Sequence, residues 1–131
     1  MKIQPPDKIY VNDSPIHGLG VFAKKKIKEG DVFEICPVLD IGMRVGEVSS
    51  VLLNYRFNWP SGTTWEKQVV GLGYASLYNH SNNPNAQWRS VYNDNVFEFF
   101  ALRDIEPNEE ILVYYGGQSY WEDGRTSIEV K

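Results

Sequence analysis

The chain has 131 residues, a length that suits one folded domain rather than two independent ones. Hydrophobic residues make up 42% of it and aromatic residues 14%, the composition of a globular protein, and no stretch approaches the roughly 20 apolar residues that a membrane span needs. The formal net charge of -4 disfavours general binding to nucleic acid phosphates and suits a cationic partner, although ordinary surface charge explains the same value.

Short runs of Val, Ile, Phe and Tyr alternate with Gly, Pro, Asn and Asp, which predicts a mostly β domain. One helix is predicted over 45–57, because Val48, Val51, Leu52 and Tyr55 recur at three- and four-residue spacing. The expected strands, in chain order, are 8–11, 20–23, 32–39, 68–71, 86–90, 96–101 and 111–113.

The segments 22–32 and 100–111 resemble each other, each with a strand, a turn and a second strand. Gly30 and Asn108 occupy the matching turn position, and these two residue types adopt a positive φ most easily. The correspondence predicts two similar turns. Two copies are too few for a solenoid, and a common strand-turn-strand unit explains them equally well.

The termini and the possible metal ligands narrow the class of protein. The segment 1–6 carries a charge but no apolar run behind it, so it predicts neither a signal peptide nor a lipid anchor, and we expect an intracellular protein of the cytoplasm, the nucleus or a host cell. Cys36 is the only cysteine, which excludes an internal disulfide and a thiolate-rich zinc site. Because His17 and His80 are the only imidazoles and lie far apart in the chain, we expect no catalytic metal.

Two polar or glycine-rich segments are candidates for ligand contact. In 17–23 (HGLGVFA), Gly18 and Gly20 remove side chains from a turn, so that a ligand can approach the backbone, although most Gly-x-Gly pairs are ordinary turns. In 79–86 (NHSNNPNA), the amide of Asn79 offers donors and an acceptor for a zwitterionic or adenine-bearing ligand, or else closes an Asx turn.

A third segment, 109–117 (EEILVYYGG), has an apolar strand that ends at Tyr114 and Tyr115. A tyrosine at a strand end usually packs and makes one hydrogen bond, so packing alone explains this segment. In their order along the chain, however, the three segments resemble the Gly-x-Gly, Asn-His-Ser and Glu-Glu-to-Tyr motifs of the SET family of protein lysine methyltransferases. The resemblance covers about 8–121 and is nearest to the very small viral and bacterial-type SET proteins, which lack cysteine-rich zinc flanks.

This resemblance implies a fold, an activity and a set of site residues. The implied fold is a single SET domain over 1–131, with its core over about 8–121 and a C-terminal tail over 122–131. It is mostly β, of the β-clip type, with several short sheets, a minor helix and a C-terminal pseudoknot. The implied activity is transfer of a methyl group from S-adenosylmethionine, without a metal, to a lysine of a histone-like or other basic protein. The implied residues are Tyr115 as the catalytic residue, His17, Gly18, Leu19, Gly20, Asn79, His80, Tyr115 and Trp121 at the cofactor, and Tyr55, Tyr74, Val113 and Tyr120 in the lysine channel.

The sequence departs from the family pattern near Tyr115. Val113 stands where the family often has Phe or Tyr, and its smaller side chain predicts room for a second or third methylation. Tyr114 replaces the usual acidic residue of the motif. Trp121 is predicted either to stack on the adenine or simply to pack.

Two other functions are compatible with parts of the sequence. One is a noncatalytic SET or β-clip module that binds a basic peptide or another ligand. The other is a carbohydrate-binding or antifreeze-type β-clip domain, which suits the turns 27–31 and 105–109 but leaves Asn79, His80 and Ser81 unexplained. The expected partner is a lysine-containing basic protein or peptide, not nucleic acid or a membrane, and both a monomer and a homodimer remain open.

Overall fold

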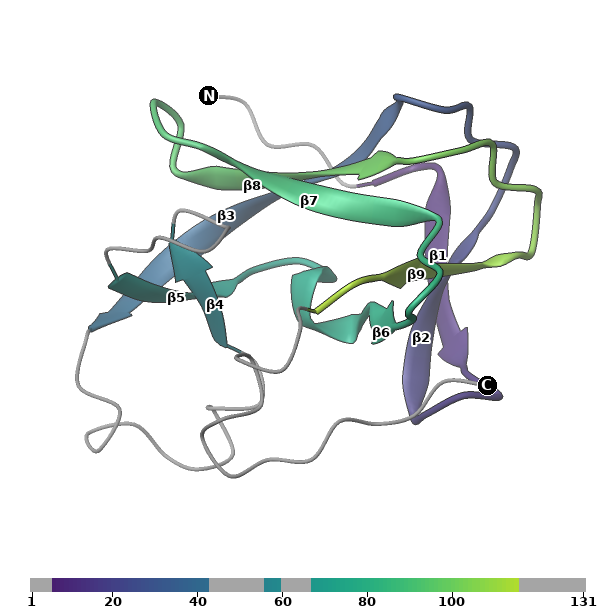
Figure 1. Ribbon diagram of the computed structural model, residues 1–131, viewed down its shortest axis with the longest axis horizontal. Coiled ribbons are helices and arrows are strands. Elements are labelled where there is room, and N and C mark those ends of the chain that lie inside the picture. Colours follow the sequence, from purple (N-terminus) through teal and green to yellow (C-terminus); the bar gives the residue numbers. More distant parts are fainter. Residues whose placement is uncertain (1–5, 43–55, 60–66, 116–131) are drawn as a thin grey trace.

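The computed structural model describes residues 6–42, 56–59 and 67–115 (Figure 1). These residues form nine strands and one short 3-10 helix, η3 (Ala75–Leu77), so the mostly β expectation is confirmed for them. The described part of the chain has no helix long and apolar enough to cross a membrane. The strands are β1 (Ile9–Asp13), β2 (Leu19–Ala23), β3 (Val32–Gly42), β4 (Arg56–Trp59), β5 (Lys67–Gly71), β6 (Asn79–His80), β7 (Ala86–Val91), β8 (Val96–Ala101) and β9 (Glu110–Val113).

The strands form two sheets. The smaller sheet has the order β1-β2-β9-β6 and the larger one the order β4-β5-β3-β8-β7 (Figure 1). Their pairs are antiparallel except for β6 and β9, which run parallel. The last strand of the described residues, β9, therefore lies between two strands that come much earlier, β2 and β6, and this insertion brings distant motifs together.

The expected strands are all present, within a few residues at each end, and the structure adds β4 and β6. Most of the predicted helix, 45–55, lies outside the described residues, but its last two residues belong to β4, so this end of the helix prediction is wrong. Phe57 pairs with Val69 of β5, and its ring lies 5.0 Å from that of Phe97. Pairing with β5 and burial of the ring outweigh the local helical spacing.

The core consists of residues that alternate along the strands. In β8 the buried side chains of Val96, Phe97, Phe99 and Ala101 follow this pattern apart from the first pair. Aromatic rings fill much of the interior, with Trp59 and Tyr78 at 2% and 1% exposure. Burial of large rings is the main apolar contribution to folding, at about 25 cal/mol per Å² of apolar surface.

The two similar turns expected from the sequence lie side by side and are bonded to each other. Ile27 and Ile105 exchange both backbone hydrogen bonds, at 2.9 and 2.8 Å. Gly30 (φ +86°) donates to Ala101, and Asn108 (φ +68°) makes the equivalent bond to Ala23. Positive φ at both turn positions explains why glycine and asparagine stand there.

Candidate active site

The parallel pair of β6 and β9 brings the second and third motifs into contact. Asn79 lies opposite Leu112 and His80 opposite Val113. The pairing continues beyond β6, because the Ser81 N–H donates to the Val113 carbonyl at 2.9 Å. Segments that are more than thirty residues apart in the sequence thus form one ladder, and Tyr115 lies two residues beyond its last pair.

The side chain of Asn79 fastens the first motif to this ladder. Its amide nitrogen donates to the carbonyl oxygens of His17 and Leu19, at 3.0 and 3.2 Å, and to Glu110 Oε2 at 2.9 Å. All three motifs therefore meet at Asn79. Since the amide N–H groups already have protein acceptors, what this side chain offers to a ligand is its oxygen.

The two glycines of the first motif are required for different reasons. Gly18 has a φ of +49°, and a Cβ there would meet no atom within 4 Å, so backbone conformation selects glycine at an open position. At Gly20 a Cβ would lie 2.4 Å from Glu110 Oε2. Both oxygens of that carboxylate accept a hydrogen bond from Ser14 Oγ at 2.9 Å. Glycine at position 20 thus leaves space for the Glu110 carboxylate, which bonds to the loop at Ser14. This contact explains the glycine without a bound ligand.

His80 holds the backbone of Tyr115. Its Nδ1 accepts the Tyr115 N–H at 2.9 Å, and its Nε2 lies 3.1 Å from Asn82 Oδ1. A backbone N–H can only donate, so Nδ1 is unprotonated and the ring proton on Nε2 is donated to Asn82. Burial lowers the pKa of His80, which favours this neutral ring further. The imidazole acts here as a positioning group for the residue that follows the ladder.

Both the hydroxyl and the ring of Tyr115 are held in place. Its hydroxyl donates to the carbonyl of Tyr78 at 2.5 Å, and its ring packs against the core and lies 5.2 Å from the His80 ring. The neighbouring Tyr114 is held through its backbone, since Gln87 Oε1 accepts its N–H at 3.2 Å and Gln87 Nε2 donates to its carbonyl at 3.4 Å. The amide of Gln87 thus bonds to the Tyr114 backbone just beyond the end of β9, as a neighbouring strand would.

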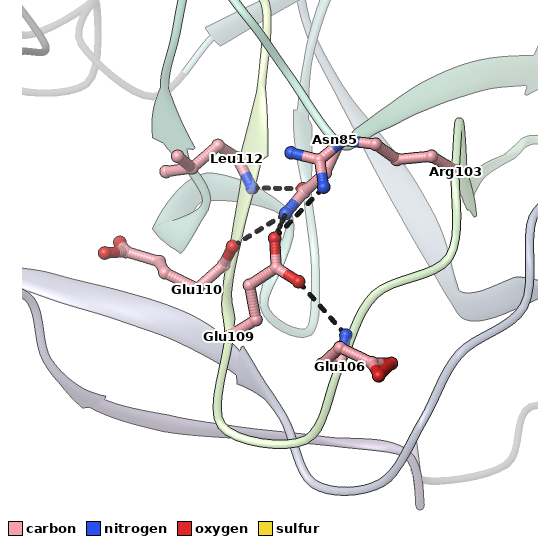
Figure 2. Close-up of polar contacts among 6 residues, drawn as sticks. All are labelled: Asn85, Arg103, Glu106, Glu109, Glu110 and Leu112. Carbon is pink, nitrogen blue, oxygen red and sulfur yellow. Dashed lines mark hydrogen bonds and ion pairs between the residues drawn. The ribbon is translucent and has the colours of Figure 1, made fainter.

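Asn85, near the end of the second motif, also fixes β9. Its side chain is 1% exposed, donates to the Glu110 carbonyl at 2.9 Å and to Glu109 Oε2 at 3.2 Å, and accepts the Leu112 N–H at 2.8 Å (Figure 2). Glu109 in turn accepts from Arg103 at 3.3 Å (Figure 2). Asn85 of the second motif and Glu109 of the third therefore help to dock β9.

A buried carboxyl lies beneath the site, and sequence reasoning missed it. Glu34 of β3 is 5% exposed and accepts the Tyr78 hydroxyl at 2.6 Å and the Tyr74 N–H at 2.8 Å. Burial raises the pKa of Glu34, and it raises that of the neighbouring Cys36 thiol still more. The available signal was a lone acidic residue inside an otherwise apolar strand.

The remaining predicted site residues are only partly placed. Val113 is buried within the core cluster, and Tyr74 is half-buried and packs against that cluster. Three predicted residues, Tyr55, Tyr120 and Trp121, lie outside the described residues. Among the residues that are described, no group of three or more His, Cys, Asp or Glu side chains could hold a metal ion.

Comparison with known proteins agrees with the three motifs. The SET domain family model matches residues 18–116. A Schizosaccharomyces pombe histone-lysine N-methyltransferase, H3 lysine-37 specific, is 33% identical over 120 residues, which cover 89% of this chain and 79% of that relative. The histone-lysine N-methyltransferase TRX1 of Oryza sativa subsp. japonica is 36% identical in an alignment of 114 residues that covers 78% of this chain and 11% of that much longer protein.

Solved structures give the same result. A Plasmodium falciparum protein assigned as a histone methyltransferase superposes with a TM-score of 0.71 at 33% identity, covering 88% of this chain and 97% of the other. A Neurospora SET domain histone lysine methyltransferase, 18% identical, supports the fold with a TM-score of 0.63 over 84% of this chain and 52% of its own. The resemblance inferred from the three motifs is confirmed, and this chain belongs to the SET-domain family.

Proposed function

We propose that this chain is a protein-lysine N-methyltransferase that transfers a methyl group from S-adenosylmethionine to the ε-amine of a lysine in a histone or another basic protein. One observation carries the proposal: Asn79 joins the glycine loop and Glu110, while the next residue, His80, holds the backbone of Tyr115 two residues beyond the ladder. Family membership supports the reaction type, and the S. pombe relative's name makes histone H3 the first substrate to test. A histone substrate implies a nuclear protein.

The groups around Asn79 suit a positively charged cofactor. They are acceptors or anionic: the Asn79 oxygen, the loop backbone and the carboxylate of Glu110. When bound, S-adenosylmethionine supplies an electrophilic methyl group on a cationic sulfonium, and its amino group is a second cation. The open space at Gly18 leaves room for a ligand against the loop. We assign His17, Gly18, Leu19, Gly20, Asn79, His80, Tyr115 and Trp121 to this contact.

The hydroxyl of Tyr115 is suited to accept a hydrogen bond, rather than to donate one, at the reacting centre. Its proton is directed at the Tyr78 carbonyl, so its lone pairs are what the hydroxyl presents on its other side. Lone pairs there would orient the electropositive methyl group and the amine, which need to approach within roughly 3 to 3.5 Å and in line. The hydroxyl then acts by positioning, and the reaction needs no phenolate.

The substrate lysine has to lose a proton first. Its reference pKa of about 10.4 makes the neutral amine roughly 4 to 5 kcal/mol less stable than the ammonium at pH 7. Desolvation in an aromatic channel lowers that difference, as does repulsion from a nearby cation. We assign Tyr55, Tyr74, Val113 and Tyr120 to the channel, with the small Val113 leaving room for further methylation of the same lysine.

The direct test is methyl transfer by the purified chain. Wild-type protein with labelled cofactor and recombinant histone H3 should yield labelled H3, and Tyr115→Phe should lose most of this activity while melting at nearly the same temperature. Cofactor that binds the folded state should raise the melting temperature of both proteins. A shift without transfer to H3 or to other basic proteins would leave a noncatalytic binding module instead.

A further inference from the structure

The buried carboxyl of Glu34 is the one strongly buried acid among the described residues that the proposed reaction does not use. A carboxyl group loses its hydration at such a position and is retained only if protein donors replace the water. The Tyr78 hydroxyl at 2.6 Å and the Tyr74 N–H at 2.8 Å both donate to Glu34. These are the residues that flank η3 on either side. One side chain therefore fixes both ends of this turn to β3.

The residues around Glu34 leave space for its carboxyl and hold the Tyr78 ring beside it. Gly73 has a φ of +70°, and a Cβ there would lie 2.6 Å from Glu34 Oε2, so the chain has glycine where the carboxyl approaches. Tyr78 is 1% exposed, and its ring stacks on Phe99 with centroids 4.4 Å apart. Burial, and then the negative charge of Glu34, raise the pKa of Tyr78 well above 10, so the phenol keeps its proton and remains the donor.

The other end of Tyr78 faces the site. Its carbonyl oxygen accepts the hydroxyl of Tyr115, so the position of this main-chain oxygen decides where the hydroxyl points. The hydroxyl of Tyr78, bonded to Glu34, fixes the rotation of the same residue from the opposite side. Two consecutive hydrogen bonds thus run from Glu34 through Tyr78 to Tyr115.

We propose that Glu34 and Tyr78 are positioning residues for methyl transfer, because together they fix the carbonyl that orients the Tyr115 hydroxyl. The proposal rests on the function proposed above and assigns a role to a carboxyl that touches neither reactant. Loss of this anchor should leave binding intact and impair the chemical step, since a misplacement of about 1 Å can cost roughly a hundredfold in rate.

Tyr78→Phe is the informative variant, because it keeps the ring stack and the carbonyl and removes only the anchor. We expect its kcat to fall about tenfold or more, with KM for cofactor and peptide within about twofold of wild type. Glu34→Gln, which keeps one acceptor oxygen, should show the same split with a smaller loss. Val96→Ala serves as the matched control, because Val96 is as buried as Tyr78 but is the first residue of β8, where it pairs with Pro37 and Val91, whereas Glu34 pairs with Phe99.

Kinetics are measured at about 15 °C, close to the temperature at which small proteins are most stable, and melting temperatures measured in parallel show whether each variant is folded. The positioning role would be overturned if Tyr78→Phe had the kcat of wild type. It would also be overturned if Val96→Ala lost as much kcat as Tyr78→Phe for the same decrease in melting temperature. Either result would leave the proposed function standing. If wild-type protein itself transfers no methyl group, the proposed function fails, and this role fails with it.

Discussion

Replacing Gly20 by alanine tests whether the glycine loop is shaped by Glu110. The added methyl would lie 2.4 Å from Glu110 Oε2 and 3.1 Å from Ser14 Cβ, so the carboxylate has to move. Moving it breaks the hydrogen bonds from Ser14 and Asn79, each 2.9 Å long. Hydrogen bonds to a charged group contribute about 1.5 to 3 kcal/mol each, and water replaces part of this at a half-buried site. We expect Gly20→Ala to lower the free energy of unfolding by about 2 to 4 kcal/mol.

Urea unfolding of single and double variants separates this cause from others. Gly18→Ala is the control, because its methyl meets nothing within 4 Å and only its φ of +49° is strained, which costs about 1 to 2 kcal/mol. In a Glu110→Ala background the collision with the carboxylate is absent and only the 3.1 Å approach to Ser14 Cβ remains, so Gly20→Ala should then cost less than about 1 kcal/mol. An equal cost of Gly20→Ala in both backgrounds would refute the collision with Glu110 as the reason for this glycine.

Three further changes have defined outcomes. Asn85→Asp places a carboxylate where the amide donated to Glu109, and it should lower the free energy of unfolding by about 3 to 5 kcal/mol in urea, more than Asn85→Ala does. His80 has a lowered pKa in the folded state, so its contribution to stability is present above about pH 6.5 and is lost as the pH falls from there through the folded pKa. The melting temperature of wild type should therefore fall more steeply than that of His80→Asn between about pH 7.5 and 5. Parallel curves for the two proteins would contradict this role. Val113→Phe should restrict the product to monomethyl-lysine in mass spectrometry, and wild type that yields only monomethyl-lysine at saturating enzyme would contradict the role given to Val113.

Local pattern predicted most of the fold. The strands were found from alternation and from turn residues, since both signals lie within a few neighbouring positions. β6 was missed because it has only two residues and exists through its parallel partner β9, a chain segment with no local link to it. β4 was missed because apolar residues at helical spacing precede it, whereas pairing with β5 decides the strand.

The order of three short motifs was enough to identify the family and to name Asn79, His80 and Tyr115 as site candidates. What each side chain does there was not readable. The amide of Asn79 donates to loop carbonyls and to Glu110, and the ring of His80 accepts the Tyr115 N–H. These assignments depend on which atoms lie within 3 Å, a property that residue types alone do not contain.

By itself, then, the sequence determined the strands, the turns that need positive φ at Gly30 and Asn108, and the family, because backbone preference and motif order are carried by adjacent residues. Only the tertiary structure decided why Gly20 is glycine and what Glu34 supports. Their partners lie far along the chain, 96 residues apart for Ser14 and Glu110 and 40 for Glu34 and Tyr74. Contacts over such separations follow from the pairing of distant strands, which no local stretch of sequence specifies.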